Sequence, residues 1–209
     1  MVTGLLGNES SDSNRFTLVT PKSENDVRLQ ATLGNQNPTG LPVGVVRRNM
    51  NNLCSLIERR PDAVAMVRGS DVYRRIRGRV LFYGVEDAVA VRVEIEGLPR
   101  GRGPCQNPMF AFHIHSGTKC EGNPKDEFAD AGMHYNPGNC KHPYHAGDMP
   151  PLLGVNGNAL SVFLTDRFTI REIIGRVVII HVNPDDFMTQ PSGNSGEKIA
   201  CGVIKRAFR

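Results

Sequence analysis

The chain has 209 residues, a hydrophobic fraction of 39% and a formal net charge of +4. This length fits one ordinary domain with an extension, or two small domains, and the composition is that of a protein with a buried core. The small, dispersed excess of Lys and Arg gives little support to a nucleic-acid-binding surface. No apolar run approaches the roughly 20 residues that span a bilayer, so we expect neither a nucleic-acid nor a membrane partner.

The amino terminus, MVTGLLGNESSDSNRF, has neither the basic start nor the apolar stretch of a secretory signal. A cytoplasmic location and the removal of an earlier leader both agree with this, and we expect a cytoplasmic protein. The five cysteines form no C-x-x-C pair, which argues against a zinc ribbon or a thioredoxin-like motif. They are either free thiols or a small disulfide set.

Residues 1–61 are predicted to form an N-terminal extension. Residues 1–44 are rich in Ser, Thr, Asn and Gly and keep no steady hydrophobic period, which predicts a largely flexible segment. Apolar residues then recur at helical spacing, which predicts a short helix over 46–59 that ends before the next proline: Val46, Met50, Leu53 and Ile57. We interpret it as packed on the domain, with a dimer contact or a disordered linker as alternatives.

From residue 62 onward the pattern is typical of β-strands. Val89, Val91, Val93 and Ile95 alternate with polar or small residues, as in a half-buried antiparallel strand. Similar runs occupy residues 63–67, 79–83, 110–115, 160–164, 177–181 and 199–204. Many short strands with few helix signals predict an all-β sandwich or barrel.

Two features of the predicted β domain stand out from the pattern of short strands. Arg75, Arg77 and Arg79 share one strand face, which we interpret as a solvated face rather than an anion-binding patch. The segment 116–157 is too long for an ordinary structureless loop, and it carries three histidines and two cysteines. That content favours a functional loop.

The stretch FAFHIHSG, residues 110–117, places two histidines on one strand face. Side chains at i and i+2 point the same way, so Phe110, Phe112 and Ile114 face one side while His113 and His115 face the other. Core packing explains the first set only. Same-face Cα atoms are roughly 6.6 Å apart, close enough for two rings to reach one metal ion.

All six histidines lie between residues 113 and 181, which together favours a metal site over six unrelated histidines. The stretch HPYHAGD offers His142, His145 and Asp148 in a loop, a donor set that suits zinc. His181 ends the apolar strand RVVIIHV, where it could complete a set with His113 and His115.

Five stretches, FAFHIHSG, AGMHYNP, KHPYHAGDMP, VVIIHVNPDD and GNSGEKIACGVI, together resemble the copper/zinc superoxide dismutase family, its bacterial members included. The similarity covers approximately residues 62–204, within a domain that we place at 62–209. It implies an immunoglobulin-like eight-stranded Greek-key β-barrel with a long metal-binding loop, an architecture for which this enzyme is itself a known example. The implied reaction is disproportionation of two superoxide anions to oxygen and hydrogen peroxide, with copper cycling between two oxidation states.

The resemblance also implies the site residues. Copper would be held by His113, His115, His134 and His181. Zinc would be held by His134, His142, His145 and Asp148, so that the catalytic His134 is a shared bridge. Asp185 would link a copper-ligand histidine to a zinc-ligand histidine, and Cys120 and Cys201 would form a disulfide. We further predict a second bridge between Cys105 and Cys140, with two buried free thiols as the alternative and Cys54 unpaired.

Lys198 stands where the family normally has an arginine, and Glu197 beside it offsets part of the positive field. Lysine keeps the charge but loses the planar guanidinium fork, so we expect reduced rather than abolished activity. Weaker steering of superoxide is also expected, because the segment between His181 and Lys198 is short. The alternative function is a non-catalytic copper- or zinc-binding member, and a homodimer is possible although no motif specifies it.

Overall fold

A computed structural model describes residues 55, 58–101 and 108–207. The chain divides into two compact units, Met1–Met50 and Asn51–Arg209, and the described residues all belong to the second unit. The predicted flexible segment 1–44, and nearly all of the predicted helix 46–59, lie outside the described residues. These two expectations therefore stay predictions.

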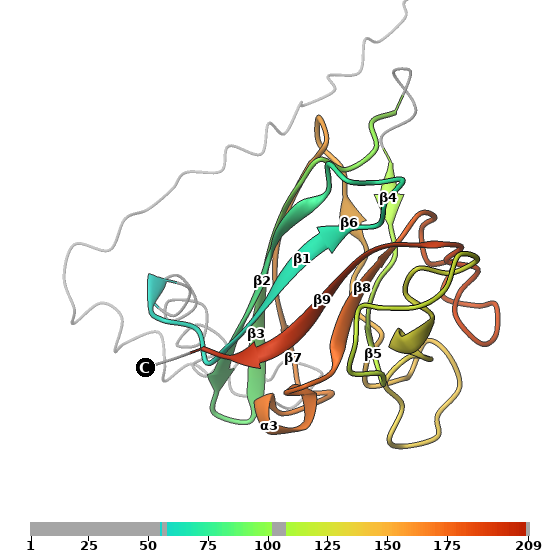
Figure 1. The fold of residues 1–209 in the computed structure, drawn as a ribbon. Coiled ribbons are helices and arrows are strands. Elements are labelled where there is room, and N and C mark those ends of the chain that lie inside the picture. The colour runs from blue at the N-terminus through green and yellow to red at the C-terminus, as the bar shows by residue number, and fades with distance from the viewer. Residues whose placement is uncertain (1–54, 56–57, 102–107, 208–209) are drawn as a thin grey trace, which may run out of the picture. The chain divides into compact units, whose positions relative to one another are not determined.

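One curled antiparallel sheet of seven strands dominates the described part of the chain (Figure 1). Its spatial order is β5-β8-β9-β1-β2-β3-β7. The bounds are Ala63–Gly69 for β1, Arg77–Val85 for β2, Ala88–Glu96 for β3, Phe112–His115 for β5, Asn158–Thr165 for β7, Val177–His181 for β8 and Lys198–Arg206 for β9. All seven coincide with predicted strand runs, so the all-β class is confirmed.

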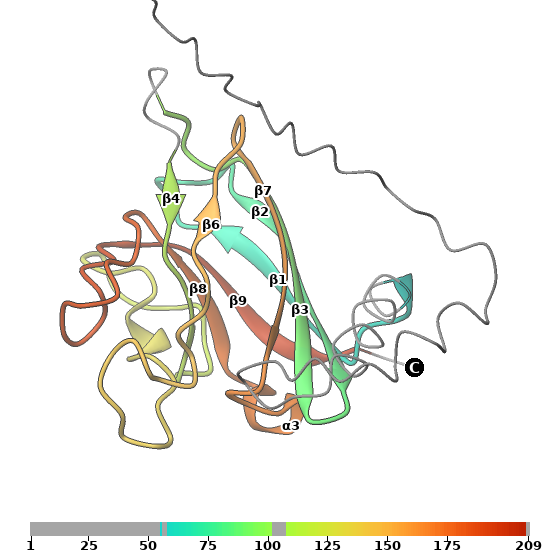
Figure 2. The same cartoon turned by 180° about the vertical axis from the view of Figure 1, so that it is seen from behind.

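A second sheet pairs β4 (Met109–Phe110) with β6 (Leu152–Leu153), seen beside the large sheet in Figure 2. The described residues thus contain nine strands, whereas eight were predicted. The predicted run 110–115 divides at Ala111, whose N–H bonds to Asn183 and whose carbonyl accepts from His181. β6 lies inside the stretch that was predicted to be a loop. Greek-key connectivity stays a prediction.

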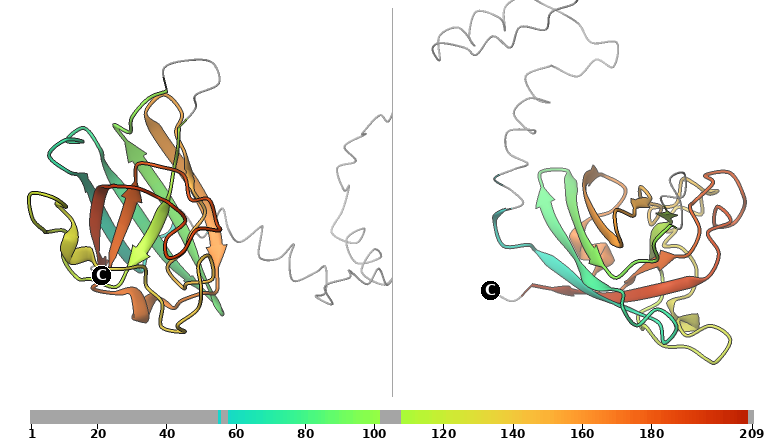
Figure 3. Two further views of the ribbon diagram at one scale, coloured as in Figure 1. Left: turned by 90° about the vertical axis from the view of Figure 1, so that its right-hand side faces the viewer. Right: turned by 90° about the horizontal axis from the view of Figure 1, so that it is seen from above.

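Figure 3 shows how the large sheet curls. The main core contains buried residues from all seven of its strands. Alternate residues of each strand point into it, as the period of two predicts. In β5 these are Phe112 and Ile114, each fully buried, and Phe110 of β4 joins them. The histidines of β5 consequently lie on the opposite face.

That opposite face is covered where β8 and β9 meet the long loop after β5. Val177, Ile179 and Cys201 pack there against Phe128 and Ala131 from the loop. The loop contains a short 3-10 helix, η2 (Ala129–Ala131), and a four-residue helix, α3 (Ile170–Ile173), follows β7. This part of the loop therefore packs against β8 and β9 rather than extending into solvent.

Arg77 and Arg79 lie on an exposed face of β2 and pair across the ladder with Glu96 and Glu94 of β3. Exposed pairs of this kind contribute little to stability because solvent screens them. Both match the solvated strand face that the sequence predicts, but Arg75, predicted to share that face, lies in the turn before β2. Within the described ranges, no helix has the length and apolar character needed to cross a membrane.

Candidate metal centre

Three histidines come directly from neighbouring strands. His113 and His115 lie on β5, and His181 ends β8, which pairs antiparallel with β5. Their relative exposures are 0%, 2% and 4%. The sheet register therefore brings together three imidazoles on the face away from the core, as their spacing in the sequence predicts.

Each of these rings uses one nitrogen to fix its orientation. His115 Nδ1 donates to the Gly132 carbonyl at 2.8 Å, and His181 Nδ1 donates to the Gly196 carbonyl at 3.0 Å. The opposite nitrogens, Nε2 of both rings, lie 3.3 Å apart. Because the outer nitrogens carry the protons, the inner ones present lone pairs, which is the form in which histidine binds a metal.

His134 comes from the long loop and lies beside this set. It forms an isolated β-bridge with His115, and its ring centroid is 4.0 Å from that of His113. Its Nδ1 lies 2.7 Å from Asp148 Oδ1, while its Nε2 is buried and has no hydrogen-bond partner in the described part of the chain. One ring thus turns one nitrogen toward the strand histidines and the other toward a carboxylate.

Two ligand groups result, and they share His134. The first ligand group is His113, His115, His134 and His181, and the second ligand group is His134, His142, His145 and Asp148. Within each group the potential ligand atoms all lie within 4.8 Å of one another, and every member is buried. These are the two residue sets that the sequence resemblance implies.

Distances inside the second ligand group match a small tetrahedral cation. Donor atoms about 2.0 to 2.1 Å from a zinc ion would be separated by about 3.3 Å along each tetrahedral edge. His145 Nδ1 lies 3.4 Å from His134 Nδ1 and 3.3 Å from Asp148 Oδ1. His142 Nδ1 lies 3.1 Å from Asp148 Oδ2. His134 Nδ1 and Asp148 Oδ1 lie closer, at 2.7 Å, so the donors are gathered at or slightly inside the spacing around a bound ion.

Unpaired nitrogens support the same reading. His113 Nδ1 and His134 Nε2 are buried and have no hydrogen-bond partner among the described residues, and buried His142 Nδ1 makes no hydrogen bond there either, although it lies 3.1 Å from Asp148 Oδ2. A buried polar atom without a partner is rare because leaving it unpaired costs about 1 to 3 kcal/mol. All three point into the ligand groups, so the residues present fit two metal ions.

Asp185 joins the two groups from behind. Its Oδ2 lies 2.8 Å from His113 Nε2, and its Oδ1 lies 2.8 Å from His142 Nε2. This is the linking position that the resemblance implies. Gly193 leaves room for it, since a Cβ there would stand 1.9 Å from Asp185 Oδ1.

Burial sets the protonation of the site. Desolvation lowers the pKa of His113, lowers that of His115 well below its usual value, and lowers that of His181 to about 3. Burial alone would raise the pKa of Asp185, but the ring N–H donors and the Phe187 amide bring it to about 2. At neutral pH His113, His115 and His181 are therefore neutral imidazoles, and the Asp185 carboxylate is charged.

Contacts to backbone hold the loop of the second ligand group, and the sequence reading missed them. Gln190 accepts from the His142 N–H at 3.0 Å and donates to the His142 carbonyl at 2.7 Å. Arg167 Nη1 donates to three carbonyls of the loop, and Gly147 approaches β5 so closely that a Cβ would stand 2.2 Å from the Ile114 carbonyl. A side chain that recognises carbonyls leaves no spacing pattern, so only the glycine offered a signal.

Lys198, predicted to attract the substrate, is paired. Its Nζ donates to Asp126 Oδ2, and the two side chains are 16% and 40% exposed. Burial tends to raise the pKa of Asp126, but the bond from Lys198 and the Phe128 N–H lower it overall. Part of the positive field that the sequence suggests is therefore neutralised by a residue 72 positions away.

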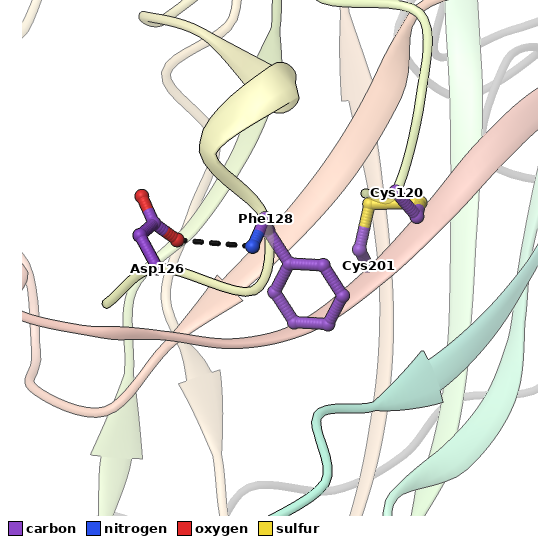
Figure 4. The surroundings of a disulfide bond; sticks show 4 residues. All are labelled: Cys120, Asp126, Phe128 and Cys201. Atoms are coloured by element: carbon purple, nitrogen blue, oxygen red, sulfur yellow. Dashed lines mark hydrogen bonds between the residues drawn. A yellow bond between two sulfur atoms is a disulfide. The ribbon is translucent and has the colours of Figure 1, made fainter. Parts of the chain in front are cut away.

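Cys120 and Cys201 form a disulfide with a Cα–Cα distance of 5.6 Å. Figure 4 shows the bond beside Phe128, whose N–H donates to Asp126. The bridge ties the long loop to β9. Cys140 is an exposed free thiol, which does not support the predicted bridge to Cys105; Cys105 and Cys54 lie outside the described residues.

A curled antiparallel sheet carrying two buried ligand groups that share one histidine defines a β-sheet metalloprotein with paired metal sites. The family model for copper/zinc superoxide dismutase matches residues 76–204. The chain belongs to that family.

Relatives and a solved structure agree. Superoxide dismutase [Cu-Zn] 1 of Aquifex aeolicus is 34% identical over 143 residues, which is 61% of this chain and 79% of that protein. The enzyme of Deinococcus radiodurans is 30% identical over 149 residues, covering 63% and 78%. A superoxide dismutase-like protein of Bacillus subtilis is 36% identical over 110 residues, covering 46% and 55%. A crystal structure of a double mutant, with two histidines introduced, of a SOD-like protein from the same species aligns with a TM-score of 0.57 at 28% identity, covering 66% of this chain and 94% of that one.

Proposed function

We propose that this protein is a copper/zinc superoxide dismutase that converts two superoxide anions to oxygen and hydrogen peroxide. The observation that carries the proposal is the shared position of His134, whose two nitrogens face two different ligand groups. A lone metal site needs no such arrangement. Bound copper would supply a one-electron couple that accepts an electron from one superoxide and returns it to the next.

The donor types favour one metal over the other in each group. Three imidazoles and a carboxylate at tetrahedral spacing suit zinc, which has no redox chemistry, so we assign zinc to the second ligand group. Four imidazoles suit copper, so we assign copper to the first ligand group. The family to which the chain belongs supports both assignments.

His134 is the residue with a proton to give. Its Nε2 is buried and no described residue forms a hydrogen bond with it, while its Nδ1 lies 2.7 Å from Asp148 Oδ1. When Nε2 is not coordinating, it can hold a proton next to the first ligand group. Peroxide formation consumes two protons, and His134 Nε2 would be a local source of one.

Lys198 would draw the anionic substrate toward the first ligand group. It stands on β9 opposite His181 in the strand register, close to the ligand histidines. The ion pair with Asp126 reduces its field, and lysine lacks the two-pronged hydrogen bonding of the arginine that the family resemblance leads one to expect. Both features support activity that is present but lower than steering by a free cation would give.

A second candidate function is a metal-binding protein without turnover. The similarity to a Bacillus subtilis relative that is named only superoxide dismutase-like favours it. Against it stand the complete ligand groups of this chain.

Metal analysis combined with a superoxide-consumption assay separates the two candidates. The purified protein is loaded with copper and zinc, and both metals are counted per chain. One of each with rapid consumption supports the dismutase, and the His115→Ala variant should then lose consumption while keeping its zinc. One of each without consumption would instead support the metal-binding function.

A further inference from the structure

Arg167 follows β7 and lies far in sequence from the loop that carries most of the second ligand group. Its Nη1 donates to the carbonyls of Pro143 at 3.0 Å, His145 at 3.3 Å and Asp148 at 3.1 Å. One nitrogen with two protons thus serves three acceptors that converge on it. A single guanidinium nitrogen therefore holds three carbonyls of the loop together.

Two of the three carbonyls belong to residues of the second ligand group itself, and the third follows His142 directly. A shift of any one carbonyl by a few tenths of an ångström would turn the attached side chain. Pairs of donor atoms in this group already lie 2.7 to 3.4 Å apart, around the edge length of a tetrahedral ion, so only small movements are compatible with binding one. The backbone position that Arg167 fixes is therefore the position that the ligand geometry needs.

Other contacts also anchor the loop, and the bond from the Ile114 N–H to the Gly147 carbonyl at 2.9 Å lies inside the interval that Arg167 spans. Gln190 binds the backbone of His142 on both sides, and the Gly147 N–H donates to the Tyr135 carbonyl at 2.8 Å. The Asp148 N–H also bonds back to the His145 carbonyl, at a longer 3.2 Å. Arg167 spans the interval from 143 to 148.

Arg167 is itself exposed and lines an open hollow of about 390 Å³ together with Phe163 and Phe187. Its replacement removes no core volume and leaves no buried charge. Loss of this side chain is thus separable from loss of the fold, in contrast to loss of a core residue.

We propose that Arg167 is a positioning residue for the second ligand group, which sets its affinity for zinc by holding three loop carbonyls on one guanidinium nitrogen. This rests on the proposed function only in naming zinc as the ion. Outer residues that orient metal ligands typically change affinity by about 10-fold to 100-fold when removed. We expect Arg167→Met to weaken zinc binding within that range.

The test compares Arg167→Met, Arg167→Lys and a control, Arg171→Met, with the wild type. Arg171 is an exposed arginine of α3. Zinc affinity is measured by chelator competition with Zn²⁺ alone. A lysine ammonium also carries three N–H donors, so Arg167→Lys should recover most of the affinity. The control should match the wild type, and all metal-free melting temperatures should agree.

The inference is overturned if Arg167→Met binds zinc like the wild type, if the lysine variant recovers nothing, or if Arg171→Met loses as much. It is also overturned if the metal-free Arg167→Met protein melts lower to the extent that it loses affinity, since Arg167 would then be an ordinary stabilising contact. Wild-type protein that takes up no zinc would overturn it as well. Superoxide consumption by the wild type tests the proposed function separately.

Discussion

The first ligand group stands mainly on strands, whereas the second stands mainly on a loop. His113, His115 and His181 are placed by the β5–β8 ladder, whose register is fixed by a core packed on its other face. His142 and His145 are positioned by side chains that hydrogen-bond to the loop backbone, chiefly those of Gln190 and Arg167. The difference teaches that a site can be rigid in two ways, by sheet register or by tying a loop down from several directions.

Replacing His134, the one residue common to both ligand groups, should impair the strand-based site and the loop-based site alike. His134→Ala removes a donor from each group, so we expect both metals to be lost and superoxide consumption to fall more than about 100-fold. His115→Ala should weaken only the first ligand group, and His145→Ala only the second. Elemental analysis of the three variants checks this, and an intact second site in His134→Ala would contradict the shared role.

The next largest effect is expected at Asp185, because its carboxylate orients one histidine ring in each ligand group. Asparagine keeps one oxygen, and its amide would face an imidazole N–H, so one ring must turn. We expect Asp185→Asn to lower both metal affinities by about 10-fold to 100-fold.

The matched control for that change is Asp186→Asn. Asp186 is an exposed neighbour that caps the Met188 and Thr189 amides and touches no ligand histidine. Chelator competition measures both variants for each metal. If Asp185→Asn weakens only one site, the carboxylate does not couple the two groups.

The role of Lys198 in attracting superoxide to the first ligand group can be tested by removing its ion pair with Asp126. Asp126→Asn keeps the oxygen that accepts from the Phe128 N–H but removes the charge that pairs with Lys198. We expect faster superoxide consumption, by less than about tenfold, and a steeper decline with added salt. Lys198→Ala should be slower and flatter with salt.

Two controls separate this local effect from net charge. Asp130→Asn and Lys125→Ala change exposed charges in the same loop. Their salt profiles should stay close to that of the wild type. A salt profile of Lys198→Ala that equals the wild-type profile would remove Lys198 from guidance.

A smaller effect is expected from acid, which should lower the stability of the metal-free protein through its strand histidines. The pKa of His181 is about 3 in the folded chain and about 6.5 when unfolded. Below about pH 6.5 the unfolded chain binds protons that the folded chain does not, so stability falls until the pH passes the folded pKa. His113 and His115, whose pKa values are also lowered, act in the same direction.

We expect the metal-free melting temperature to drop by about 5 °C or more between pH 7 and pH 5. Asp185 does not contribute to that drop, because its pKa of about 2 places its own loss at lower pH. Calorimetry over this range checks the sign. A flat profile would mean that the rings are solvated in the folded protein.

Alternation and histidine spacing were enough to predict the strands and to place His113, His115 and His181 together, whereas the role of His134 in the first ligand group followed from the family resemblance. A period of two assigns Ile114 to the core and His115 to the other face, and the structure agrees. The pairing of Cys120 with Cys201 and the linking role of Asp185 followed from family resemblance, since partners so far apart in sequence leave no local pattern. Arg167 and the Lys198–Asp126 pair could not be predicted, because each contact depends on how loops fold over the sheet.

β5 is the last strand of its sheet, yet its outer side is not open. The Ile114 N–H donates to the Gly147 carbonyl, the Ile114 carbonyl accepts from Tyr135, and the Ser116 N–H donates to Met133. Isolated bridges also join His113 to Asp148 and His115 to His134. An uncovered edge strand invites pairing with another molecule. The segments that carry the ligands of the second group therefore also shield this edge, so their release would expose a surface prone to aggregation.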